Sequence, residues 1–241
     1  MPNHVRSRIT APATVLSALL GTDENGKEYV DFKRVLPCPD IIVQVEYPSY
    51  LKDEAEIRVG GFIDMDAAQQ PGNVLADYVR QGNFGAAAKA LHSQSLIKQK
   101  MEGRTFTEDE EALISQMVSA YHQTGYMTWF DWQRGVWGTK WNAYNFGRVS
   151  EYIVEFDTAW NAPHPVIEAL AGTLKTQFLH EWADEDTGHN VGCRQYRDDG
   201  LFSSEELSKT REGYELCFKL RPEDAEYYQL VDGEYEYIDE D

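Results

Sequence analysis

The chain has 241 residues, 41 of them acidic and 22 basic, which gives a formal net charge of −19 at pH 7. Because 42% of the residues are hydrophobic and 12% are aromatic, the chain can bury a core, and its composition excludes a short disordered effector. It has no run of about 18 apolar residues and no signal-peptide pattern at its start, so we expect a soluble intracellular protein. Its three cysteines lack CxxC spacing, so we expect neither a disulfide scaffold nor a zinc knuckle.

The negative charge is concentrated in the last quarter of the chain. Residues 1–120 contain 17 acidic and 12 basic residues, residues 121–180 contain 5 and 4, and residues 181–241 contain 19 and 6, a balance of −13. Such an asymmetry affects solubility and the choice of partner rather than the fold. It argues against a phosphate backbone as the main ligand.

The first elements predicted are a strand and a helix. Residues 5–9 alternate apolar and polar side chains, which predicts a half-buried strand with Val5 and Ile9 on its buried face. Residues 12–20 carry apolar side chains at helical spacing and are followed by Gly21, which predicts a short helix.

The middle of the chain has helical periodicity. Its spacing predicts helices over residues 73–80, 84–101 and 107–124. The third helix opens on a capping box, in which Thr107 caps the backbone of Glu110 and the Glu110 carboxylate reaches back. These segments predict a small helical subdomain.

The second half returns to a strand–helix pattern. Residues 151–158 are rich in β-branched and aromatic side chains and predict a strand, and residues 163–174 predict a helix that starts behind prolines. Residues 176–182 and 191–196 predict two more strands, with a turn signal at Asp199-Gly200.

A strand–helix unit near each end of the chain, around a helical middle, predicts an α+β fold. We expect a ferredoxin-like split βαβ arrangement with one antiparallel sheet and an inserted helical subdomain. The expected division is a first half of the ferredoxin-like domain at 1–62, a helical insertion at 63–128, a second half at 129–202 and an acidic C-terminal extension at 203–241. Trp141, Phe156 and Trp160 are expected to be largely buried.

Two tryptophan-rich stretches carry a family resemblance. They are Trp129-Phe130-Asp131-Trp132-Gln133-Arg134 and Trp137-Gly138-Thr139-Lys140-Trp141-Asn142-Ala143. With residues 156–167, and with residues 1–5 and 35–39 as N-terminal landmarks, they resemble the YubB family of ferredoxin-like proteins, which plasmids, phages and pathogenicity islands carry. The resemblance implies a ferredoxin-like fold and an origin in a mobile genetic element. We therefore expect the protein to be located in the cytoplasm of a bacterial host cell. The resemblance implies no established enzyme activity and no catalytic residues.

The sequence shows no constellation typical of catalysis. Five residues have side chains that can bind a metal: His180, Glu181, Asp184, His189 and Cys193. Their spacing matches no recognised metal-ligand motif. Solvated turn residues are the simpler interpretation. We therefore expect a protein that is not an enzyme, with no catalytic residue, no bound metal and no cofactor.

The acidic C-terminal quarter has two interpretations. It is either a solvated tail that keeps the protein soluble, or a surface where tyrosines supply contact area and carboxylates steer a basic partner. The candidate partner-binding residues are Glu223, Asp224, Glu226, Tyr227, Tyr228, Glu234, Tyr235, Glu236 and Tyr237.

A secondary candidate surface is formed by Asp131, Arg134 and Lys140, which are charged residues among aromatic ones. The alternative for these three residues is a structural network that holds their loop against the sheet.

The leading functional hypothesis is a non-enzymatic interaction protein of a phage or plasmid. It would act in counter-defence or host modulation by binding a basic, nucleic-acid-handling host protein, and we expect no membrane partner. The alternative is an accessory protein that binds RNA or single-stranded DNA on the sheet face, although only Arg6 and Arg8 supply a basic strand. A cryptic metal-dependent enzyme is the third hypothesis.

Overall fold

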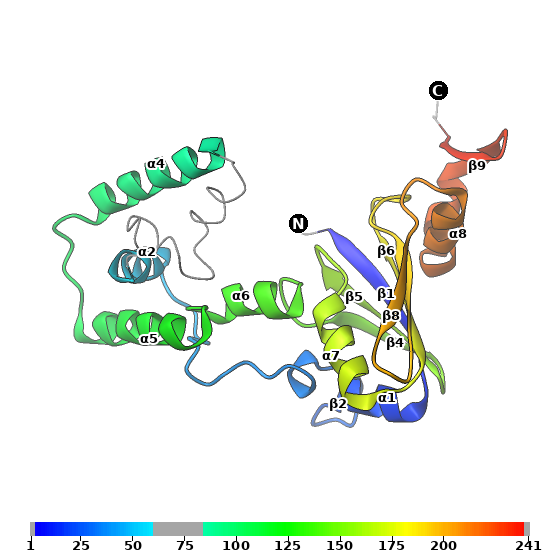
Figure 1. Cartoon of the computed structure of the whole chain (residues 1–241), viewed down its shortest axis with the longest axis horizontal. Helices are drawn as coiled ribbons and strands as arrows, with labels where there is room; N and C mark the ends of the chain where they lie inside the picture. The colour runs from blue at the N-terminus through cyan, green and yellow to red at the C-terminus, as the bar shows by residue number, and fades with distance from the viewer. Residues whose placement is uncertain (1–2, 60–83, 239–241) are drawn as a thin grey trace. The chain divides into compact units, whose positions relative to one another are not determined.

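The computed structural model describes residues 3–59 and 84–238. The chain forms two compact units (Figure 1), which we call the ferredoxin-like unit, Met1–Pro37 with Gln133–Asp241, and the helical unit, Cys38–Trp132. The predicted helix over 73–80 lies outside the described residues.

The ferredoxin-like unit is built on an antiparallel sheet. Its described strands are ordered β4-β5-β1-β6-β7-β8. Their bounds are β1 His4–Thr10, β4 Tyr144–Ser150, β5 Ile153–Ala159, β6 Phe178–Asp184, β7 Gly192–Tyr196 and β8 Phe202–Glu206. The central strand β1 pairs antiparallel with both β5 and β6. Because β5 and β6 are linked through helix α7, β1 lies inside a split βαβ unit, and the predicted ferredoxin-like α+β fold is confirmed.

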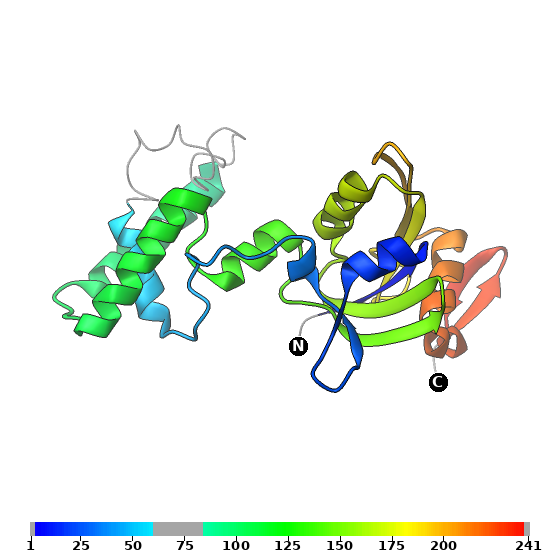
Figure 2. The ribbon, with the colours of Figure 1, turned by 90° about the horizontal axis from the view of Figure 1, so that it is seen from below.

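Helices cover both faces of this sheet. Their bounds are α1 Ala13–Leu19, α7 His164–Leu174 and α8 Arg211–Leu220. Helices α1 and α7 contact each other and cover the face that carries the buried side chains of Val5 and Ile9. Helix α8 contacts β6 and β1 and covers part of the opposite face, which carries Arg6 (Figures 1 and 2).

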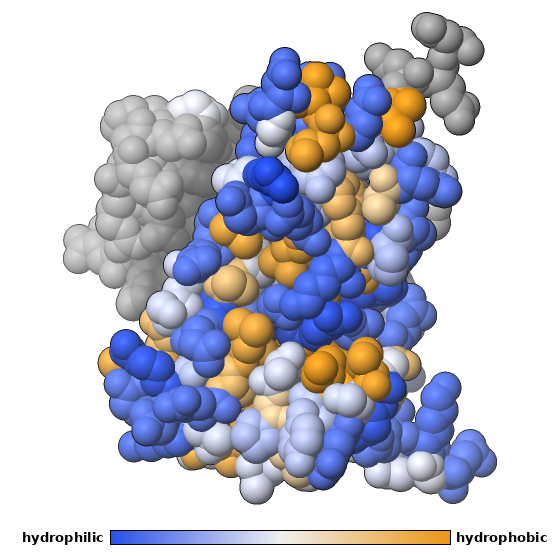
Figure 3. Space-filling view, turned by 90° about the vertical axis from the view of Figure 1, so that its right-hand side faces the viewer, coloured by the Kyte–Doolittle hydropathy of each residue, from blue (hydrophilic) through white to orange (hydrophobic). Residues whose placement is uncertain are grey.

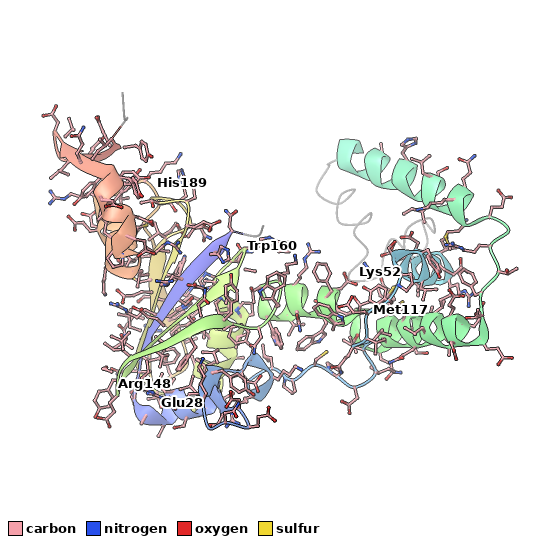
Figure 4. The ribbon with its side chains drawn as sticks, turned by 180° about the vertical axis from the view of Figure 1, so that it is seen from behind. Glu28, Lys52, Met117, Arg148, Trp160 and His189 are labelled. Carbon is pink, nitrogen blue, oxygen red and sulfur yellow. The ribbon has the colours of Figure 1, made fainter. Side chains whose placement is uncertain are left out.

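A small β2–β3 ribbon, Leu20–Thr22 and Glu28–Val30, lies beside β4. There the Arg148 guanidinium binds the Glu28 carboxylate at 2.7 Å (Figure 4).

Aromatic side chains fill the core on the α1–α7 side. Phe32, in the 3₁₀ turn Phe32–Arg34, is fully buried, and its ring centroid lies 5.6 Å from that of Trp137 and 6.1 Å from that of Phe156. The indole N–H of Trp137, which ends the π-helical segment Gln133–Trp137, donates to the Leu36 carbonyl at 2.9 Å. The predicted burial of Phe156 is confirmed.

The expectation that Trp141 and Trp160 would be largely buried is wrong, because both are only half-buried. The Lys140 ammonium lies over both rings, 4.5 Å from the centroid of Trp141 and 5.0 Å from that of Trp160. A hydrated cation on a ring keeps that ring at the surface. The exposure of Trp141 and Trp160 therefore follows from the neighbouring Lys140, and their aromatic character alone did not predict it.

The helical unit contains α2 Ser49–Arg58, α4 Phe84–Met101, α5 Glu108–Thr124 and the short α6 Trp129–Trp132. Its core comprises Val43, Leu51, Ala55, Ile114, Met117 and Met127. The predicted capping box is confirmed: Thr107 Oγ1 accepts from the Glu110 N–H at 3.3 Å, and the Glu110 carboxylate accepts from the Thr107 N–H at 2.8 Å. Gly125, with φ of 80°, ends α5.

The two compact units divide the chain differently from the expected ranges. The helical unit begins at Cys38 rather than at residue 63, because α2 supplies Leu51 and Ala55 to the helical core. Residues 203–220, expected in a separate extension, supply most of β8 and all of α8 to the ferredoxin-like unit.

Candidate functional site

The acidic C-terminal segment is anchored by α8. The Thr210 hydroxyl caps this helix by accepting from the Gly213 N–H at 3.0 Å. Its apolar stripe packs in a cluster of Ala183, Val191, Leu216, Cys217 and Leu220. The Lys219 ammonium binds the Glu181 carboxylate of β6 at 2.6 Å. These contacts fix the start of the segment on the sheet.

After α8 the chain forms a 3₁₀ segment, Pro222–Tyr227, and a hairpin of β9 Tyr228–Val231 and β10 Glu234–Tyr237. The turn residues Asp232 and Gly233 have φ values of 50° and 95°. Asp-Gly is a standard pair for a two-residue hairpin turn, because both positions need positive φ. Through residue 238 the segment is thus folded rather than an extended tail.

This fold creates a pocket of about 230 Å³ beside the turn that follows β6. Its lining residues are Glu185, Asp186, Thr187, Asp224, Tyr227, Tyr228 and Tyr237. Tyr228 and Tyr237 are directly paired across the hairpin, so they project on one face of it. The structure therefore brings together four of the predicted partner-binding residues and three that the sequence analysis missed.

The three tyrosine rings that line the pocket lie in two orientations. The rings of Tyr227 and Tyr237 are nearly parallel, at 11°, with centroids 6.4 Å apart. The Tyr228 ring stands at 84° to that of Tyr237, with centroids 5.5 Å apart. Burial raises the pKa of Tyr228, and a hydrogen bond to Glu226 raises the pKa of Tyr227. Both hydroxyls therefore stay neutral at pH 7.

The carboxylates of the pocket have different surroundings. Asp224 accepts from the Arg221 Nε and from the Thr187 hydroxyl, each at 3.2 Å. Glu185 and Asp186 are exposed, and Asp186 lies 3.4 Å from His189 Nδ1. Such an arrangement of carboxylates and ring faces attracts cations.

The other five predicted partner-binding residues lie outside the pocket. Tyr235 is half-buried against α8, with its ring centroid 5.6 Å from that of Tyr214 and 5.1 Å from that of Phe218. It anchors the hairpin. The remaining four, Glu223, Glu226, Glu234 and Glu236, are exposed. Glu234 and Glu236 alternate with Tyr235 and Tyr237 along β10, so they project from the opposite face of the hairpin.

We call the whole region, residues 185–187 and 222–237, the terminal acidic surface. Figure 3 shows the side of the molecule that carries α8 and the hairpin, where hydrophilic surface predominates and hydrophobic patches are separate. Its exposed carboxylates, which make this surface acidic, include those of Glu185, Asp186, Glu223, Glu226, Glu234 and Glu236.

The secondary candidates lie in different units. Asp131, in the helical unit, binds the Lys52 ammonium at 3.2 Å and accepts from the Thr128 hydroxyl at 2.8 Å. Arg134, in the ferredoxin-like unit, lies 5.2 Å from the ring centroid of Trp160, which Lys140 also contacts (Figure 4). Within each unit these contacts are those of a structural network.

The residues considered for a metal do not point the same way. His180 Nε2 lies 3.1 Å from the Ser7 hydroxyl on the α7 side of the sheet, whereas the adjacent Glu181 binds Lys219 of α8 on the other side. Over residues 3–59 and 84–238, no group of three or more His, Cys, Asp or Glu side chains is placed to hold a metal. Nor does any helix in those ranges have the length and apolar character needed to cross a membrane.

The sheet face on the α8 side carries ion pairs. The Arg6 Nε donates to Asp157 at 2.9 Å, and the Arg8 Nε donates to Glu155 at 2.6 Å. Arg6 also donates to the Leu220 carbonyl of α8 at 3.4 Å. The two arginines of the predicted basic strand are thus neutralised within the sheet.

Comparison with known proteins finds a ferredoxin-like domain model that matches part of the chain. Residues 136–219, which are 84 of the 241 residues, match the family model described as the ferredoxin-like domain in Api92-like protein. Among solved structures, the crystal structure of the protein Api92 from Yersinia pseudotuberculosis is similar, with 11% identity, a TM-score of 0.35, and coverage of 86% of this chain and 98% of that one. No curated protein matches the chain. The family match supports the ferredoxin-like fold of the second half.

Proposed function

We propose that this chain is a non-enzymatic interaction protein whose terminal acidic surface binds a basic partner protein. The observation that carries the proposal is the pocket at that surface, where the fold gathers carboxylates and tyrosines from two segments about 40 residues apart. Carboxylates steer an oppositely charged partner, and tyrosines provide contact area at low entropic cost.

The proposed partner is a basic protein that handles nucleic acids. Such a protein presents cationic side chains that bind phosphates, and a dense set of carboxylates competes for the same side chains. We include in the proposal that the chain acts in counter-defence or host modulation as a protein of a phage or plasmid. This part rests on the resemblance of the tryptophan-rich stretches to the YubB family.

Binding of RNA or single-stranded DNA on the sheet face is the less favoured alternative. Recognition modules of that type stack bases on aromatic residues of an open sheet. Here α8 covers part of the face, and Asp157, Glu155 and Glu181 are distributed across it. These carboxylates already bind Arg6, Arg8 and Lys219, so the three cations are not available to neutralise a phosphate backbone.

The test is affinity capture from a bacterial lysate with mass spectrometry. The test variant is Glu223→Gln, Glu226→Gln, Glu234→Gln and Glu236→Gln, all at exposed positions of the terminal acidic surface. The matched control is Glu24→Gln, Glu46→Gln, Glu102→Gln and Glu151→Gln, which changes the net charge equally at exposed positions elsewhere. We expect the wild type and the control to retain a basic protein that the test variant loses. Equal capture by all three folded proteins would contradict the proposal.

A further inference from the structure

We propose that the tyrosine-lined pocket of the terminal acidic surface binds a single cationic side chain, an arginine, of the partner protein. This inference rests on the proposed function and adds the chemical group that is recognised. The pocket lies between the turn after β6, at residues 185–187, and the hairpin β9–β10.

The size of the pocket favours one side chain. Pockets for drug-sized ligands usually measure about 300 to 1,000 Å³. This pocket, at about 230 Å³, is smaller, and it is open to solvent because Tyr227 and Tyr237 are 48% and 59% exposed. A small open pocket of this size can accept the charged end of one long, flexible side chain of a partner protein.

The charge favours a cation. Three carboxylates line the pocket, and one of them, Asp224, is already neutralised by Arg221. The remaining negative charge comes from Glu185 and Asp186, both at the exposed rim. An anion would be repelled there.

The arrangement of the carboxylates favours an organic cation over a metal ion. A metal needs several ligand atoms around one point, about 2.0 to 2.6 Å from it. In the described part of the chain, acidic side chains are not gathered that closely. A guanidinium is larger, and its five N–H donors can reach separate carboxylates.

The rings favour arginine over lysine. The faces of Tyr227 and Tyr237 are nearly parallel, and that of Tyr228 is almost perpendicular to Tyr237. A planar guanidinium can stack on one ring face while its N–H groups donate sideways to carboxylates. An ammonium, which is more strongly hydrated and has no plane, uses this geometry less well.

The experiment titrates the full chain with N-acetyl-arginine amide and follows backbone amides by NMR. We expect saturable shifts confined to residues 185–187 and 222–238. N-acetyl-lysine amide should bind more weakly, and the neutral isostere N-acetyl-citrulline amide should produce no saturable shift. Equal shifts with arginine and citrulline, or arginine shifts scattered over other acidic surfaces, would overturn the inference.

Variants separate the rings from the carboxylates. Tyr237→Phe keeps the ring and should bind the arginine probe as the wild type does, whereas Tyr237→Leu should bind at least about tenfold more weakly, a loss of 1.4 kcal/mol. Glu185→Gln with Asp186→Asn should abolish binding of the arginine probe. Glu24→Gln with Glu151→Gln, the matched charge change at exposed positions outside the terminal acidic surface, should leave that binding unchanged. Equal binding by Tyr237→Leu and Tyr237→Phe would contradict the stacking role.

The two proposals fail differently. If the pocket variants keep full capture of a basic protein that the exposed-glutamate variant loses, the proposed function stands and the arginine pocket is wrong. If the arginine probe binds in the pocket but no basic protein is captured, the pocket stands and the proposed function is wrong.

Discussion

At the scale of single residues, two histidines lie close together between α7 and the sheet. His180 is fully buried and His164 half-buried, and their ring centroids are 5.6 Å apart. Burial, helped by Arg194, lowers the pKa of His164 to about 4, and burial also lowers the pKa of His180. Arg194 in turn binds Glu168 of α7. Both imidazoles are therefore neutral in the folded protein at pH 7.

The pH dependence follows from these directions. In the unfolded chain each histidine has a pKa of about 6.5, so below that pH protons bind the unfolded chain preferentially. The histidine contribution to stability is fully present above about pH 6.5 and is lost as the pH falls toward 4. We expect the Tm of His164→Gln to fall less over this range than that of the wild type. His122→Gln, at an exposed position, should follow the wild type. Parallel curves for all three proteins would contradict this account.

At the scale of elements, periodicity and turn signals predicted the parts that local sequence determines. Alternation predicted β1, and the Thr107 capping box predicted the start of α5. Helix α2 was missed because only Leu51 and Ala55 of its ten residues are buried, so its apolar pattern is weak. The terminal hairpin has a readable signal in Asp232-Gly233, a pair that favours a two-residue hairpin turn. The pocket has no signal in the local sequence, because only the tertiary fold brings residues 185–187 close to residues 224–237.

The docking of α8 gives a prediction at this scale. A methyl group added at Gly213 would lie 2.0 Å from the Leu207 carbonyl oxygen, whereas one added at Gly172 in α7 would meet nothing within 4 Å. We expect Gly213→Ala to lower the free energy of unfolding by about 1 to 3 kcal/mol through overpacking. Gly172→Ala should raise it by up to about 1 kcal/mol, because alanine favours helix. Chemical denaturation of both variants checks this, and equal effects would contradict the close packing of α8.

At the scale of the whole molecule, the acidic region is also part of the fold. Residues 181–241, with −13 of the net charge of −19, supply the end of β6, strands β7 and β8, helix α8 and most of the terminal acidic surface. The sequence predicted the fold class and the region of charge. It could not show that Asp224 is neutralised by Arg221, or that Tyr235 anchors the hairpin instead of facing a partner.

The rate of association with the captured basic protein, measured against ionic strength, tests the central claim most directly. Charges more than about 8 Å apart are largely screened at physiological salt, so steering by exposed carboxylates weakens as salt rises. We predict that the wild-type association rate falls at least about tenfold between roughly 0.05 and 0.5 M salt. The variant with Gln at 223, 226, 234 and 236 should associate slowly, with a much flatter dependence. An association rate that is independent of salt and equal for wild type and variant would contradict recognition through the terminal acidic surface.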